Sequence, residues 1–285
     1  MVAESQMGGS VKRAGSRAPD PVVLMYHGLD PGDGRYDGAP PEERAYVIAA
    51  GAFRAHLRAL AEAGRRIVDP REFLSGEGDA VLNPGDALLT FDDNDLSHYD
   101  TALPMLRDAG LKAVFFVATG LVGQPGRLDW PRLREMADAG MSIGAHGHTH
   151  QLLTSLGRDA CKGELEASRA TLRDQLGLEA ASLAFPGGRL NRRVLHQARA
   201  SGCRTAFASA PFNSEEREGV RLVGRVPVRS HWTATVMADF LAHQESRLRR
   251  MRRVETLRRA AQTCLGPVVY RWLHCAVWRL RGPCG

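Results

Sequence analysis

The stretch LLTFDD at residues 88–93 decides the fold, because a short apolar run there ends in two adjacent carboxylates. Turn formers at residues 84–86 precede it, and a short apolar run bounded in this way is typical of a buried strand. α/β folds place their chemistry at the carboxyl ends of such strands. Asp92 and Asp93 are therefore candidates for a functional site. A turn at the strand end would let both side chains reach one cavity with different roles.

Apolar runs alternate with segments of helical periodicity about seven times along the chain. Continuous apolar runs indicate strands buried on both faces, as in a parallel sheet. Because the polar candidates all follow strands, the sequence predicts a closed or nearly closed β/α barrel, with an open doubly wound sheet as the alternative. No glycine-rich phosphate-binding motif occurs, so nothing supports nucleotide binding. The expected strands are 21–27, 66–68, 88–91, 112–117, 141–145, 182–185, 205–208 and 223–228, and the expected helices are 52–64, 70–74, 99–109, 130–139, 156–176 and 192–201.

A histidine cluster, HGHTH at residues 146–150, directly follows one of these expected strands. His146 and His150 are four residues apart, a spacing that puts two imidazoles on one face of a helical turn. Two imidazoles and the carboxylate of Asp93 would bind a divalent ion such as Zn²⁺ and leave a position open for water. Asp92 would then act as base on that water, whose pKa the ion lowers to about 7. The alternative interpretation, a surface loop or an adventitious metal-binding tract, is less compatible with an Asp pair after an earlier strand.

Composition places the chain among ordinary globular proteins, with 44% hydrophobic and 25% charged residues. Residues 1–20 carry basic side chains but no apolar run, so we expect a disordered segment there and not a secretory signal. No run of about 18 apolar residues is present, which argues against a membrane-spanning helix. The five cysteines are odd in number and widely spaced, which favours reduced thiols in a cytosolic protein. The catalytic domain is expected over residues 21–243.

The basic character of the chain belongs to its C-terminal tail, residues 244–285. From residue 241 onward there are 10 Arg and 2 Glu with no Lys or Asp, a net charge of +8, so the remainder carries −2 of the total +6. The stretch 265–280 is amphipathic and rich in Trp, which suits a helix lying on an anionic membrane surface. The alternative is a helix packed on the barrel, and no motif supports nucleic-acid binding. We expect a cytoplasmic protein, and the membrane interpretation adds peripheral contact at the inner membrane face.

Taken together, these motifs resemble those of the polysaccharide deacetylase family, the NodB-homology domains of carbohydrate esterase family four. The resemblance runs over about residues 22–241 and implies a distorted seven-stranded β/α barrel. TFDD (90–93) is similar to the first family motif, HGHTH with Leu153 to the second, and FPGG (185–188) to the third. Two further segments, LMYH (24–27) and RVPV (225–228), are similar to the opening and closing strands of the branch acting on exopolysaccharides and small glycans.

The resemblance also implies roles for individual residues. Asp92 would be the catalytic base, and the metal ligands would be Asp93, His146 and His150. The third motif would shape one wall of a substrate groove. The substrate-binding candidates are His27, Pro186, Gly187, Gly188 and Arg189.

Three departures from the family pattern affect the site. Asn94 stands where Gly usually follows the Asp pair, and Asn tolerates the unusual backbone angles of such a turn. Ala184 stands where many members carry an Arg that orients the base, and Arg189 is the hypothesised substitute. The usual Leu-x-His motif that supplies a general acid is not evident. His231, just past the last expected strand, is the candidate for that role, with His27 as the alternative.

The sequence therefore predicts a metal-dependent N-deacetylase that hydrolyses the acetamide of an N-acetylated sugar, with Zn²⁺ as the expected cofactor and the carbohydrate as the partner. One alternative is an amide hydrolase of the same fold acting on a small non-glycan substrate, because 6% aromatic residues leave few stacking platforms. Trp130 and Trp232 are the candidate platforms, and a position in the core or the groove wall is the favoured interpretation of each. A second alternative is a degenerate module that binds glycan without turnover, which the departures from the motifs would explain.

Overall fold

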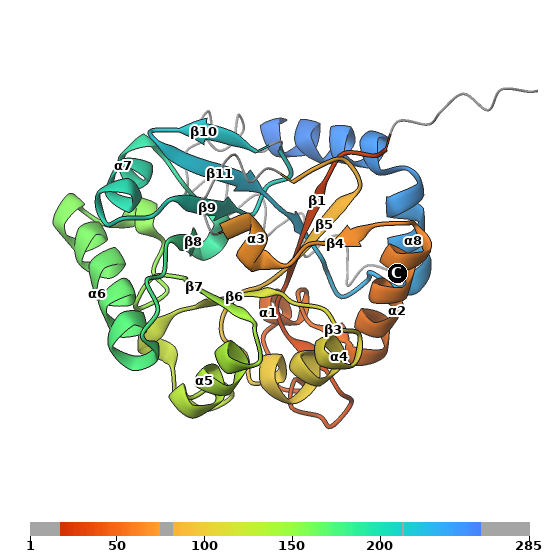
Figure 1. Cartoon of the computed structure of the whole chain (residues 1–285), viewed down its shortest axis with the longest axis horizontal. Helices are drawn as coiled ribbons and strands as arrows, with labels where there is room; N and C mark the ends of the chain where they lie inside the picture. The colour runs from red at the N-terminus through yellow and green to blue at the C-terminus, as the bar shows by residue number, and fades with distance from the viewer. Residues whose placement is uncertain (1–17, 75–81, 213, 258–285) are drawn as a thin grey trace, which may run out of the picture.

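The computed structural model describes residues 18–74, 82–212 and 214–257. This part of the chain is built around one mostly parallel sheet with helices arranged around its outside (Figure 1). The expected disordered segment, 1–20, lies almost entirely outside the described residues, and the amphipathic stretch 265–280 lies entirely outside them. No described helix is long and apolar enough to cross a membrane.

The main strands are β1 (Val22–Tyr26), β5 (Asp86–Phe91), β6 (Val114–Val117), β7 (Ser142–Ala145), β8 (Ser182–Ala184), β9 (Thr205–Ala208) and β11 (Val220–Gly224). β5, the strand that precedes Asp92, pairs in parallel with β1 on one side and β6 on the other. Every residue of these three strands is buried, which explains their continuous apolar runs. Parallel pairing continues from β6 through β7, β8 and β9 to β11.

The sheet closes into a barrel through one bent segment. β11 pairs with β9, and β12 (Val226–Pro227) pairs with β1, so this segment joins the two ends of the sheet. Arg225 alone separates the two strands, and its backbone N–H donates to the Ala210 carbonyl. The hydrogen-bonded ring β1–β5–β6–β7–β8–β9–β11/β12 confirms the predicted barrel. The antiparallel β10 (Glu215–Arg217) and the short β4 (Arg66–Ile67) lie outside this ring.

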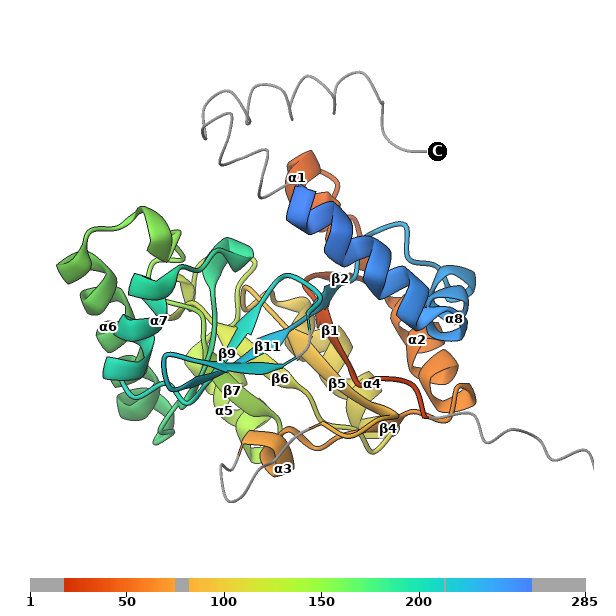
Figure 2. The ribbon, with the colours of Figure 1, turned by 90° about the horizontal axis from the view of Figure 1, so that it is seen from above.

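Side chains alternate between the barrel interior and an outer layer of helices. Along β5, Leu89 and Phe91 belong to the large outer core, whereas Leu88 belongs to a small interior cluster that includes Phe116 and Phe207. The same alternation directs the Asp92 side chain toward the barrel interior, at the carboxyl ends of the strands. Helices surround the outer core along the left, lower and right sides of Figure 1, and Figure 2 shows them from above: α2 (Ala50–Glu62), α4 (Leu103–Asp108), α5 (Trp130–Asp138), α6 (Arg158–Leu176), α7 (Arg192–Ala200) and α8 (Ala234–Ala242).

Two regions differ from the sequence prediction. The helix expected at 99–109 is divided into a π-helical turn, η1 (His98–Ala102), and α4, because Pro104 at the start of α4 has no N–H to continue the ladder. The loop expected after β1 contains structure of its own. It includes the short helix α1 (Pro41–Arg44) and is flanked by the parallel pair β2 (Leu29–Asp30) and β3 (Ile48–Ala49).

The chain beyond α8 continues as a helix over residues 244–257. Gln244 and Leu248 of this helix are buried against the barrel. The Arg65 guanidinium donates to the Gln244 side chain, whose amide donates to the Asp20 carbonyl at 2.8 Å. The first part of the basic tail is therefore packed on the domain.

Candidate active site

Chemistry-bearing side chains meet at the carboxyl ends of the barrel strands. Asp92 and Asp93 follow β5, His146 and His150 follow β7, and His27 follows β1. All five side chains line one pocket of about 330 Å³. Because the strands run in parallel, residues far apart in sequence reach the same end of the barrel.

The turn that carries the two carboxylates has a left-handed backbone. φ is 75° at Asp93 and 41° at Asn94, values that residues with a Cβ rarely adopt. The side-chain oxygen of Asn94 accepts a hydrogen bond from the Ala118 N–H at 3.1 Å, and Arg127 donates to the Asp93 carbonyl at 2.8 Å. These contacts stabilise the turn, so Asn94 serves at the position where the family usually has Gly.

The atoms of Asp93, His146 and His150 form a set that suits a divalent cation. Nε2 of His146 lies 3.1 Å from Asp93 Oδ1, Nε2 of His150 lies 2.9 Å from it, and all three ligand atoms lie within 4.8 Å of one another. Nδ1 of His146 lies 2.8 Å from the Ala184 carbonyl oxygen, which can only accept a hydrogen bond, so Nδ1 carries the proton. The lone pair on Nε2 is therefore free to coordinate a metal ion. Asp93 Oδ1 is buried without a well-formed hydrogen bond. A cation between these atoms would satisfy all three.

The electrostatics of the pocket keep Asp93 ionised. Burial raises the pKa of Asp93, but the His146, His150 and His27 imidazoles lower it by more, and the net pKa lies well below its usual range. Burial lowers the pKa of His146, while the Asp92 and Asp93 carboxylates raise it above its ordinary value. The Asp92 and Asp93 carboxylates thus favour the charged form of His146, and the same negative charge would stabilise a bound cation.

A buried arginine holds the candidate base. Asp92 is 2% exposed and Arg225 is 0% exposed. The two guanidinium Nη atoms donate to the two carboxylate oxygens, each at 2.7 Å, and the guanidinium lies 5.4 Å from the Phe116 ring centroid inside the barrel. Burial raises the pKa of Asp92, but the charges of Arg225 and His146 lower it by more. Asp92 is therefore ionised at neutral pH and can accept a proton.

Arg225 is the arginine that holds Asp92, so the hypothesis that Arg189 has this role is wrong. Arg189 is exposed and lies just beyond the 3₁₀ turn η4 (Pro186–Gly188), which directs the chain outward. The sequence did contain a signal for Arg225. It is two residues from Val223, which points into the interior cluster, so strand alternation places the arginine on the inner side.

The third motif contributes to the pocket through its backbone. Gly187 is a lining residue, and Pro186 is buried close to Gly147. A Cβ on Gly188 would lie 2.4 Å from the Ser209 Cβ, so this position requires glycine. Ser209 also lines the pocket, and the motif therefore shapes the wall by close packing.

The structure places the two candidate general acids differently. His231 is exposed, because the turn after β12 points outward and buries the neighbouring Trp232. Burial lowers the pKa of both His231 and His27, so the pKa does not distinguish the two candidates. His27 lines the pocket, with Nε2 3.9 Å from Asp93 Oδ2 and its ring 4.7 Å from the Tyr46 ring. The pocket geometry therefore favours His27 over His231 as proton donor.

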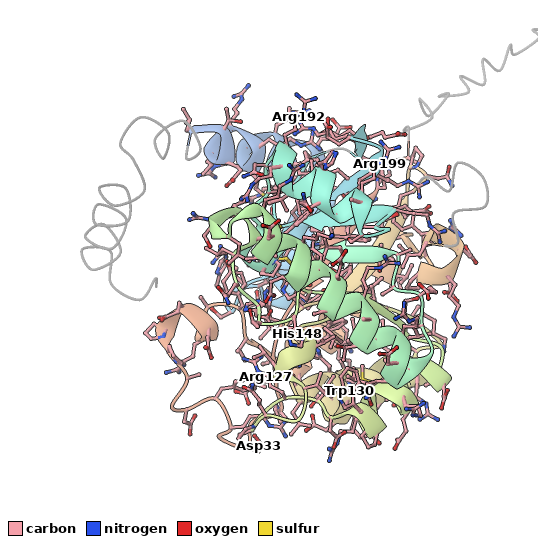
Figure 3. All side chains as sticks on the ribbon, turned by 90° about the vertical axis from the view of Figure 1, so that its left-hand side faces the viewer. Asp33, Arg127, Trp130, His148, Arg192 and Arg199 are labelled. Carbon is pink, nitrogen blue, oxygen red and sulfur yellow. The ribbon has the colours of Figure 1, made fainter. Side chains whose placement is uncertain are left out.

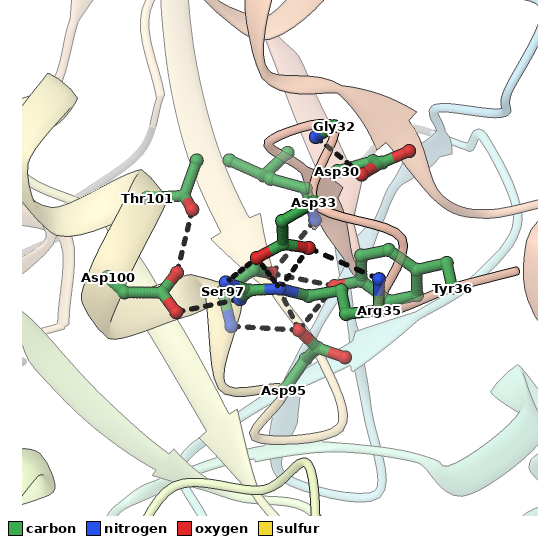
Figure 4. Close-up of polar contacts among 10 residues, drawn as sticks. Asp30, Gly32, Asp33, Arg35, Tyr36, Asp95, Ser97, Asp100 and Thr101 are labelled. Atoms are coloured by element: carbon green, nitrogen blue, oxygen red, sulfur yellow. Dashed lines mark hydrogen bonds and ion pairs between the residues drawn. The ribbon is translucent and has the colours of Figure 1, made fainter.

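Sequence reasoning missed one wall of the pocket, which comes from the loop after β1. Tyr36, Glu42, Glu43 and Tyr46 of this loop line the pocket. Figure 4 shows how the loop is held against η1: the Tyr36 hydroxyl donates to Asp95 at 2.6 Å, and Arg35 forms ion pairs with Asp33 and Asp100. Only the three-dimensional contacts reveal this wall, because its sequence has the composition of an ordinary loop.

The two tryptophans considered as stacking platforms are not lining residues of the pocket. Trp232 packs in the core against Phe240, with ring centroids 5.2 Å apart, and Trp130 is partly buried at the start of α5 (Figure 3). Among the residues that the structure describes, the aromatic rings of the pocket are Tyr36 and Tyr46. His148, also labelled in Figure 3, lies with its Nδ1 2.8 Å from the Thr119 hydroxyl and is not part of the ligand trio.

Comparisons with known proteins agree with this geometry. Residues 80–206 match the family model described as polysaccharide deacetylase. The Bacillus subtilis protein YxkH, which is named after the same family, is 27% identical over 220 residues, covering 77% of this chain and 75% of the relative.

Solved structures of deacetylases share the fold. The deacetylase PplD of Streptococcus pyogenes, solved in complex with acetate, superposes with a TM-score of 0.66 at 23% identity, covering 79% of this chain and 98% of that one. IcaB of Ammonifex degensii superposes with a TM-score of 0.64 at 25% identity, with the same coverage. The match over residues 80–206, the relative named after the same family and the shared barrel together show that this chain contains a region similar to the polysaccharide deacetylase family, in agreement with its sequence motifs.

Proposed function

We propose that this chain is a metal-dependent N-deacetylase that removes the acetyl group from an N-acetylated sugar. The observation that carries the proposal is the Asp92 carboxylate, held by Arg225 beside the trio of Asp93, His146 and His150. Two imidazoles and one carboxylate are a ligand set of hydrolytic Zn²⁺ sites, so Zn²⁺ is the proposed ion. Bound there, it would supply Lewis-acid polarisation of the acetamide carbonyl and acidify a water molecule.

The side chains of the pocket would divide the proton transfers between them. Asp92 would take the proton from the attacking water, and Arg225 would keep Asp92 ionised and correctly oriented. His27, on the same pocket wall as Asp93, would donate a proton to the departing amine. Water attack, cleavage of the C–N bond and protonation of the nitrogen would yield acetate and the free amino sugar.

The pocket walls favour a sugar over an apolar amide. A volume of about 330 Å³ lies at the lower end of the range for small-ligand sites. Tyr36, Tyr46, Glu42 and Glu43 combine two aromatic rings with carboxylates that can accept hydrogen bonds from sugar hydroxyls. This combination matches a hydroxylated ring that carries one acetamide.

Acetate release from a panel of acetamides tests the proposal. Full-length protein loaded with Zn²⁺ is given chitin oligomers, an N-acetylated monosaccharide conjugate and a non-sugar acetamide, and metal content is measured in parallel. We expect about one ion per chain, turnover of at least one sugar, and loss of turnover after chelation. Turnover of the non-sugar acetamide alone would support the small-amide alternative. Metal binding without any turnover would support the glycan-binding alternative.

Substitution of the two histidines distinguishes the candidate proton donors. His27→Ala is expected to lower kcat by about 10²–10⁴-fold, because a positioned general acid contributes that much. His231→Ala should stay close to wild type, since His231 lies outside the pocket lining. Steady-state kinetics with metal content as a control measures both. A large loss of kcat in His231→Ala alone would show that His231 is the general acid.

A further inference from the structure

The loop that carries the second imidazole is held in an unfavourable backbone conformation. His150 has φ of 62°, in the left-handed region that favours glycine, and Gly147 earlier in the loop has φ of 75°. His146 does not depend on this loop, because it directly follows β7, is 2% exposed and bonds to the Ala184 carbonyl. The His150 side chain is 34% exposed. Within the described residues, its ion-pair partner is Asp93. Something must hold the loop if His150 is to reach the cation.

Glu164 of α6 makes the contacts that hold it. Its Oε2 accepts hydrogen bonds from the backbone N–H groups of His148 at 2.9 Å and Thr149 at 2.8 Å. Its Oε1 accepts a third from the Thr149 hydroxyl at 2.8 Å. Consecutive backbone N–H groups that converge on a carboxylate form an anion-binding concavity, and charge-assisted bonds of this kind are strong. The Glu164 carboxylate thus binds the loop segment that lies between His146 and His150.

Close packing brings Glu164 to the loop. A Cβ built on Gly147 would lie 3.5 Å from Glu164 Oε2, so the carboxylate is packed against the backbone of the histidine motif. Glu164 is not one of the ligand trio and is not a lining residue of the pocket. It touches the loop backbone and the Thr149 hydroxyl.

We propose that Glu164 is a positioning residue of the metal site, which presets His150 before a cation binds. The inference rests on the proposed function, because it assumes that Asp93, His146 and His150 hold a divalent ion. Residues that orient metal ligands from outside the coordination sphere contribute about 10–100-fold to metal affinity. Without Glu164, the loop would relax from the left-handed conformation and His150 would leave the trio.

Metal titration of the full chain tests the proposal. We expect Glu164→Ala to weaken Co²⁺ and Zn²⁺ binding by about 10–100-fold and to change the visible spectrum of bound Co²⁺. Glu164→Gln keeps an oxygen that can accept the backbone bonds, so it should recover part of the affinity and the wild-type spectrum. Glu166→Ala is the matched control, because it removes the same charge from the same helix, where Glu166 forms an exposed pair with Lys162 at 3.7 Å. It should bind both metals like wild type.

The outcomes separate this inference from the proposed function. Wild-type affinity and spectrum in Glu164→Ala would overturn the inference, and an equal loss in Glu166→Ala would assign the effect to charge alone and overturn it as well. A wild-type chain that binds no metal would instead overturn the proposed function. If Glu164→Ala does not fold, Thr149→Ala removes the hydroxyl bond to Glu164 and the bond that this hydroxyl accepts from Gln151, and leaves the two backbone bonds to Glu164 in place. It should weaken binding several-fold, and unchanged binding would overturn the inference.

Discussion

Asp92→Asn is expected to lower acetate release by about 10²–10⁴-fold while the metal stays bound. Asn has nearly the shape of Asp but cannot take a proton from water, so the variant loses the base and keeps the volume. Asp92 is bonded to Arg225 and is not a member of the ligand trio, so metal binding should survive. The measurement is kcat for acetate release from the preferred N-acetylated sugar, with metal content determined on the same preparation.

Asp93→Asn is the matched comparison for this variant, because it makes the same atomic change in the neighbouring carboxylate. Asp93 belongs to the trio, so this variant should lose both metal and turnover. Near-normal turnover of Asp92→Asn would show that another group is the base. Loss of metal from Asp92→Asn together with its retention in Asp93→Asn would show that the two roles are reversed.

Arg225→Met is expected to destabilise the protein by about 3–5 kcal/mol. Both members of the Arg225–Asp92 pair are buried, and removal of Arg225 leaves the buried Asp92 carboxylate without its compensating charge. Denaturant unfolding at pH 7 measures the loss. Arg189→Met is the control, because Arg189 is exposed, and it should change stability by no more than about 0.5 kcal/mol. Equal stability of the two variants would show that the buried pair contributes nothing.

Arg225→Met should also change the pH dependence of stability and activity. In the wild type the pKa of Asp92 lies below its ordinary value of 3.8, so the pair stabilises the fold above that value and the contribution is lost as pH falls through the lowered pKa. In Arg225→Met, burial acts without the opposing arginine, so the pKa of Asp92 rises. The acid limb of the kcat profile should then move to higher pH, and an unchanged limb would argue against Asp92 as the base.

Local patterns were enough to predict the barrel and the ligand motifs. Buried parallel strands have continuous apolar sequences, so β1, β5 and β6 were visible without structure. The Asp pair and the histidine cluster could be found because each is contiguous and directly follows such a strand. Asn94 could be judged compatible with the turn because backbone tolerance is a property of the residue itself.

Longer-range relations could not be predicted in this way. Arg225 and Asp92 are 133 residues apart, and nothing near either residue identifies the other as its partner. The loop wall that carries Tyr36, the outward turn of His231 and the contact of Glu164 with the histidine loop likewise depend on packing between distant segments.

The sequence by itself determined which residues could bind a cation and which strands deliver them, because periodicity and strand-end position are local properties. Only the tertiary structure decided which arginine holds Asp92, which histidine reaches the pocket and which side chains form its walls. The physical reason is that barrel closure brings β11 and β12 between β9 and β1, and this long-range pairing places Arg225 inside the ring.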